Sequence, residues 1–245
     1  MTAPIPVAVI DGRCGRKLNN ALTMAFFDGT SKEPFATAVQ GQADGVGGHL
    51  AVLFGFRNGH SGKHVLTYSK GTAADGGRVD VPTVDYGPTE LQRDGHPLAT
   101  ILRENTPLDG KYHSAKENAP VAGPTTATLP DGTVLFRFLP DPIEPKNDDR
   151  YRIQVVDAAG TPVASLDMVR TPSGWDAGEA LVEFVLEGID SSAAGSLPIL
   201  VAGTRLVLYR ETTQVERDVL LAACVELGIS VRAYFAEMGT VTAWA

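Results

Sequence analysis

A short basic window, residues 57–70, holds the densest group of side chains that could carry out chemistry. Its sequence is RNGHSGKHVLTYSK, so a serine, a lysine and two histidines fall between positions 60 and 64. A phosphate-binding loop requires Gly-x-x-x-x-Gly-Lys before Ser or Thr, and a hydrolase elbow requires Gly-x-Ser-x-Gly. The window matches neither pattern. We therefore expect no catalytic residues, and no hydrolase or transferase activity that depends on His60, Ser61 or His64.

The two histidines of this window also bear on metal binding. His60 and His64 have the i, i+4 spacing that would place two imidazoles on one helix face, where they could bind zinc. Gly62 lies between them, and Asn58-Gly59 is typical of a hairpin turn, which argues against a helix. No cysteine or carboxylate nearby completes a ligand set. We predict no metal site here.

Two other segments contain residue types that bind ions or cofactors. The acids of 140–149 could bind a hard cation, but their spacing is not that of an EF-hand, and a solvated loop is the alternative. Gly45-Val46-Gly47-Gly48 lacks the third glycine of a dinucleotide-binding fingerprint and does not open a clear helix. We predict that the chain uses no cofactor.

The basic window is instead the candidate ligand site. It contains no acid, and its basic residues are Arg57, His60, Lys63, His64 and Lys70. An anionic small ligand or lipid headgroup needs such local positive charge, because surface potential decays over about 8 Å at physiological salt. A solvated hairpin end without a ligand is the alternative.

Overall charge excludes another class of partner. The chain has 245 residues, with 21 basic and 29 acidic side chains and a net charge of −8. A nucleic-acid binder needs clustered Lys and Arg to neutralise phosphates, so we expect no nucleic-acid partner. With 43% hydrophobic and 20% charged residues, the composition is that of a globular protein rather than a disordered one.

The cysteines and the first residues indicate a compartment. Cys14 lies between two arginines, where its pKa could be depressed, although an incidental loop thiol is the alternative. Cys224 lies in an apolar stretch and fits a buried small hydrophobe. Met1–Pro6 has neither the basic region nor the apolar core of a secretory signal. We expect two unpaired thiols and a reducing, cytoplasmic location.

Most of the chain has the pattern of short strands joined by tight turns. Asp-Gly or Asn-Gly between apolar runs predicts hairpins, because type I′ turns need positive φ at both central positions. The clearest hairpin spans Tyr151–Leu166, where Tyr151, Ile153 and Val155 alternate with polar residues. The other turns are Asp28-Gly29, Asn58-Gly59, Asp94-Gly95 and Asp131-Gly132. We predict a mainly β fold of about ten to twelve antiparallel strands, which includes strands in 179–186 and 198–201.

One segment, residues 214–239, breaks the β pattern. Its composition predicts a helix, and Gly239 could cap it. The run 219–231 is almost wholly apolar, interrupted by Glu226, but a membrane span needs about 20 such residues. A helix that is apolar nearly all round is buried on all sides. We therefore predict no transmembrane segment and a helix threaded through the middle of the β structure.

Two proline-rich segments, 105–126 and 140–149, could separate domains. The hairpin pattern recurs on both sides of each segment. We therefore predict one β-barrel domain over residues 1–245, with long surface loops.

A barrel of about twelve strands followed by a buried hydrophobic helix resembles the tubby-like fold of tubby domains, phospholipid scramblases and LURP-one-related proteins. The resemblance is strongest over 89–245 and is carried by 91–103, 151–170 and Arg217–Val225. It implies a barrel filled by its helix. In the superfamily, tubby domains bind phosphoinositide headgroups through basic side chains, and scramblases are membrane associated.

Three functions follow as hypotheses. The first is a non-enzymatic binding or regulatory module whose partner is an unidentified protein or an anionic ligand. The second is a β-rich structural subunit of a larger assembly, such as a phage virion or injection apparatus, in which the chain would be oligomeric. The third is an enzyme of unrecognised type. Arginine outnumbers lysine and alanine and glycine are frequent, which favours a bacterial source with GC-rich DNA.

Overall fold

The computed structural model describes residues 4–16, 22–28, 31, 33–40, 62–70, 77–83, 88–103, 124–141, 150–170 and 202–237. These residues form twelve strands and a C-terminal helix, α4 (Gln214–Glu237). The strands are β1 (Ala8–Arg16), β2 (Leu22–Asp28), β3 (Ala36–Gln40), β4 (Gly62–Tyr68), β5 (Arg78–Thr83), β6 (Thr89–Arg93), β7 (His96–Arg103), β8 (Thr125–Thr128), β9 (Val134–Pro140), β10 (Arg150–Val156), β11 (Pro162–Arg170) and β12 (Ala202–Leu208).

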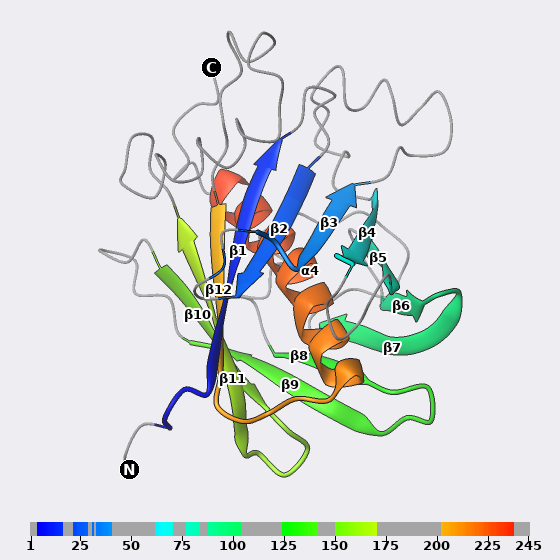
Figure 1. The fold of residues 1–245 in the computed structure, drawn as a ribbon. Helices are drawn as coiled ribbons and strands as arrows, with labels where there is room; N and C mark the ends of the chain where they lie inside the picture. Colours follow the sequence, from blue (N-terminus) through cyan, green and yellow to red (C-terminus); the bar gives the residue numbers. More distant parts are fainter. Residues whose placement is uncertain are drawn as a thin grey trace, which may run out of the picture.

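The strands close into an antiparallel barrel (Figure 1). Each strand pairs with the next in sequence, and β1 pairs with β12 to close the wall, with Ile10 opposite Leu206. Closure removes the free edges that an open sheet would present. The predicted fold class, a mainly β antiparallel barrel with a buried C-terminal helix, is confirmed.

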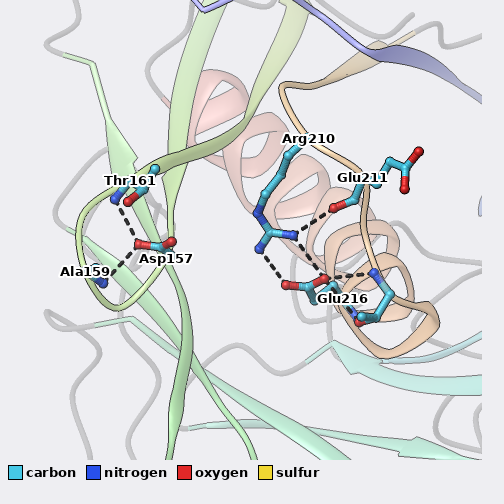
Figure 2. Close-up of polar contacts among 7 residues, drawn as sticks. Asp157, Ala159, Thr161, Arg210, Glu211 and Glu216 are labelled. Atoms are coloured by element: carbon cyan, nitrogen blue, oxygen red, sulfur yellow. Dashed lines mark hydrogen bonds and ion pairs between the residues drawn. The ribbon is translucent and has the colours of Figure 1, made fainter.

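Turn chemistry explains several of the hairpins. Asp94 (φ 49°) and Gly95 (φ 82°) form the turn between β6 and β7, as a type I′ turn requires. At the β10–β11 turn, the Asp157 carboxylate accepts hydrogen bonds from the backbone N–H groups of Ala159 and Thr161 (2.9 and 2.8 Å; Figure 2). Gly160 supplies the positive φ there. The turns predicted at 94–95 and in 151–166 are confirmed, whereas Gly29 and Asn58-Gly59 lie outside the described residues.

Alternate strand residues face the barrel interior and pack against α4. Phe136 and Phe138 of β9 are at most 1% exposed and belong to one hydrophobic cluster with the helix. Every residue of α4 from Asp218 to Leu227 is buried, as the prediction of a helix apolar all round requires. Full burial of a Val, Leu or Phe side chain stabilises the fold by roughly 1.5–3 kcal/mol, so α4 is central to the stability of the barrel.

The strand order gives the barrel two unlike ends. Odd-numbered strands finish at one end, which we call the loop end; β1 and β3 point toward it in Figure 1. Connections 41–61, 104–124, 141–149 and 171–201 leave and return there, as do the shorter 17–21 and 84–88. The opposite hairpin end has the connections 29–35, 69–77, 94–95, 129–133, 157–161 and 209–213. Helix α4 follows β12 and therefore runs from the hairpin end to the loop end.

Several predicted linkers, strands and caps can be compared with the described strands and helix. The connections 104–124 and 141–149, which overlap the two candidate linkers, join strands that pair with each other. The strands predicted in 179–186 and 198–201 lie outside the described residues, and so does the helix cap predicted at Gly239.

Candidate functional site

Two acidic side chains lie in the fully buried part of α4. Asp218 is 0% exposed and Glu226 is 1% exposed. An isolated ionised carboxylate in an apolar interior is very costly, so each must have compensating partners. Both have an arginine partner on the barrel wall, one near each end of the buried part of α4.

Asp218 is held at the hairpin end by three donors. The Tyr68 hydroxyl donates to Oδ1 at 2.5 Å, and the Gln214 side-chain amide donates to the same oxygen at 2.7 Å. Arg93, the last residue of β6, donates to Oδ2. Burial and the contact with Asp218 both raise the pKa of Tyr68, so its hydroxyl stays protonated and remains a donor. This cluster ties β4 and β6 to the first turns of the helix.

Glu226 is paired at the loop end. Arg103, the last residue of β7, donates from its guanidinium to Glu226 Oε1 at 2.6 Å, and the two side chains are 7% and 1% exposed. Removing one member of a buried ion pair typically costs about 3–5 kcal/mol, because the other charge is left uncompensated. The pair therefore fixes where the second half of α4 sits against the wall.

The start of α4 is capped by its own residues. Thr213 Oγ1 accepts from the Glu216 N–H at 3.3 Å, and Glu216 Oε2 accepts from the Thr213 N–H at 2.8 Å. This reciprocal pair is a capping box. Arg210 also donates to Glu216 Oε1 at 2.6 Å (Figure 2), which holds the pKa of that carboxyl below its usual value. These contacts therefore fix the start of α4 just before the helix enters the barrel.

The outer face near the closing seam carries a row of alternating charges. Strand register places Asp11, Arg205, Asp167 and Arg152 side by side on β1, β12, β11 and β10. Arg205 donates to Asp11 at 2.8 Å and Arg152 to Asp167 at 2.6 Å. Each carboxylate raises the pKa of its arginine partner. The row is self-neutralising and offers little net charge to a ligand.

The residues of the basic window fall in different places. Arg57 and His60 lie outside the described residues. Lys63 and His64 are consecutive in β4, opposite Pro82 and Val81, so these positions belong to opposite faces of the wall. Lys70 is exposed in the turn after β4, at the hairpin end. Lys63 and Lys70 are therefore about 20 Å apart along the strand direction.

The observed polar centres differ from those expected from sequence. Tyr68, Arg93, Arg103, Asp218 and Glu226 are not among the predicted site residues. Asp218 and Glu226 could have been predicted, because each lies inside an apolar helical run. A carboxylate buried there needs a hydrogen-bond donor. The arginines carry no comparable local signal, because their partners are more than a hundred positions away in the chain.

The two buried acidic residues, Asp218 and Glu226, join α4 to the barrel wall. In the part of the chain that the structure describes, no three His, Cys, Asp or Glu side chains gather to hold a metal ion. Among the same residues, no helix is both long and apolar enough to cross a membrane. Comparisons with protein families, with characterised proteins and with solved structures gave no match to this chain.

Proposed function

We propose that this chain is a non-enzymatic, tubby-like binding or regulatory module that contacts its ligand with the loop end of the barrel. The observation that carries the proposal is the filled interior: α4 is buried from Asp218 to Leu227 in one cluster with the wall. A barrel occupied by its own helix leaves recognition to its outer surface and ends. Binding residues are commonly located on the connections at such an end.

Charge on the connections favours one side of the loop end for an anionic lipid headgroup. Connections 141–149 and 171–201, between β9 and β12, contain nine acids and one lysine. Connection 41–61, which precedes β4, contains Arg57 and two histidines with a single acid, Asp44. The strands β1 and β2 separate these regions around the wall, and surface potential decays over about 8 Å at physiological salt. Arg57 and Lys63 are therefore the basic residues that we assign to the headgroup.

Vesicle flotation tests this proposal. The wild type should float with vesicles of phosphatidylcholine mixed with phosphoinositide, but not with phosphatidylcholine alone, and more strongly at low salt. Arg57→Glu/Lys63→Glu should lose binding. The control Lys70→Glu/Arg137→Glu makes the same charge change at two exposed positions, one at the hairpin end and one within β9, and should bind as the wild type does. No flotation of the wild type, or equal loss in both variants, rejects the loop-end site.

The expected compartment is the cytoplasm. Cys224 is a free, buried thiol, which suits a reducing environment. A bacterial source remains part of the same proposal, supported by composition. Both are compatible with a module that meets an anionic surface from its cytoplasmic side.

A further inference from the structure

The barrel wall has one short seam, between β5 and β6. Among the described residues of these two strands, only Val79–Arg93 and Asp80–Gln92 are partnered across the seam. In the described strands, every other neighbouring pair has at least four partnered positions. The backbone ladder between β5 and β6 is therefore confined to the hairpin end of the barrel.

The local sequence explains why this ladder is short. The β6–β7 register shifts between Leu91 and Gln92, and a bulge at such a shift increases the local twist of the strands. Pro82 of β5 has no N–H to contribute to a ladder. Toward the loop end, Val81 of β5 and Leu91 of β6 are 0% and 1% exposed. Side-chain packing rather than a backbone ladder therefore closes that part of the seam.

The buried carboxylate of Asp218 bridges this seam from inside the barrel. It accepts hydrogen bonds from Tyr68 of β4 on one side and from Arg93 of β6 on the other, and β5 lies between those two strands. Helix α4, which carries Asp218, also packs against β5. A hydrogen bond between two charged groups is about twice as strong as one between neutral groups. The contact with Arg93 therefore holds β6 to the helix and, through Tyr68, to β4.

We propose that the seam between β5 and β6 is where the native barrel opens, and that the Asp218 carboxylate is the latch that keeps it closed. Native proteins open locally in regions that few hydrogen bonds hold. In the open form β6 separates from β5, and Val81 and Leu91 become accessible to water. The strands β10, β11 and β12 stay paired, because their ladders are long. This device does not depend on the proposed headgroup site.

Amide hydrogen exchange of the full chain, resolved by residue with NMR, tests the latch. In the wild type, the amides of 79–80 and 92–93 that bond across the seam should exchange at least about tenfold faster than those of the β11–β12 ladder. Asp218→Asn keeps the size of the side chain but removes the charge that Arg93 binds. It should speed exchange across the seam about tenfold, the factor that corresponds to one hydrogen bond to a charged group.

A core variant on the opposite side of the wall separates local opening from global unfolding. Leu166 of β11 is 1% exposed and stays packed when the seam opens. Leu166→Ala should therefore speed exchange in the β11–β12 ladder but leave exchange across the β5–β6 seam at the wild-type rate. If Asp218→Asn does not fold, Tyr68→Phe, which removes one donor to the carboxylate, should speed seam exchange several-fold instead. Equal acceleration of seam exchange by Leu166→Ala overturns the proposal, as do wild-type seam amides that exchange no faster than the β11–β12 amides.

Discussion

At the residue scale, the buried arginine–carboxylate pairs are the contacts whose loss matters most. Exposed pairs such as Arg152–Asp167 are screened by water and typically contribute about 0–1 kcal/mol. The Arg103–Glu226 pair lies in the interior, where neither charge can turn to solvent if its partner is removed. The same type of ion pair therefore has different consequences on the two faces of one wall.

Arg103→Ala should lower the free energy of unfolding by about 3–5 kcal/mol, because Glu226 is left buried without its cation. The double variant Arg103→Met/Glu226→Leu should recover most of that loss, since it removes both charges of the pair. Urea unfolding followed by circular dichroism measures both. The control Arg152→Ala should cost no more than about 1 kcal/mol. A double variant as unstable as Arg103→Ala would show that the charge left behind is not the cause.

Cys224 provides a second residue-scale prediction. Burial raises the pKa of its thiol to about 12, and the thiolate is the reactive form. In a Cys14→Ser background, iodoacetamide at neutral or mildly alkaline pH should therefore leave the native protein unlabelled and label it after unfolding in urea. Intact mass measures the addition of the label. Rapid labelling of the native protein would contradict the buried position of this part of α4.

At the element scale, the helix start contributes a stability that depends on pH. The pKa of Glu216 is lowered in the fold by the hydrogen bond from Arg210. A carboxyl with a depressed folded pKa stabilises the fold above its unfolded pKa of about 4.5 and loses this contribution as pH falls through the folded value.

Glu216→Gln should therefore be less stable than the wild type at neutral pH, by about 0.3–1 kcal/mol, because glutamine keeps a capping-box side chain but lacks the charge that Arg210 and the helix N-terminus stabilise. The difference should shrink as the pH falls below 4.5, because the carboxyl is then protonated first in the unfolded chain and, at lower pH, in the folded protein as well. Urea midpoints at several pH values test this. A difference that stays constant from neutral to acidic pH would mean that the carboxylate charge at the cap has no role.

Helix α4 as a whole is predicted to be required for cooperative folding. A chain truncated after Thr213 lacks every side chain that α4 contributes to the core, and it should show no sharp unfolding transition. Leu221 is 0% exposed, so Leu221→Ala should cost roughly 2–5 kcal/mol. Leu221→Asp should be worse, because it buries an unpaired carboxylate. If the truncated chain melts as sharply as the full chain, α4 is not the centre of the fold.

At the scale of the whole molecule, local sequence patterns predicted the strands, turns and helix better than they predicted the buried polar clusters around Asp218 and Glu226. Positive-φ turns and alternating strands depend on neighbouring residues, so the 94–95 turn and the β10–β11 hairpin could be read directly. The apolar run of α4 predicted its burial. The partnership of Asp218 with Tyr68 and Arg93 depends on how distant strands are brought together by closure, and no spacing in the sequence encodes it. The position of Lys70 at the opposite end from Lys63 likewise required the strand direction.

The mass of the protein in solution separates the proposed module from the alternative, a subunit of a phage virion or injection apparatus. The wall of twelve described strands is closed, so it leaves no strand edge for neighbouring copies to extend. The row around Arg205 is neutralised within the chain, so it offers little charge for subunit pairing. We therefore expect light scattering after size exclusion to give the monomer mass of 25.9 kDa, unchanged on tenfold dilution. A ring or filament that persists on dilution would favour the assembly, and the loop end would then be a contact between subunits.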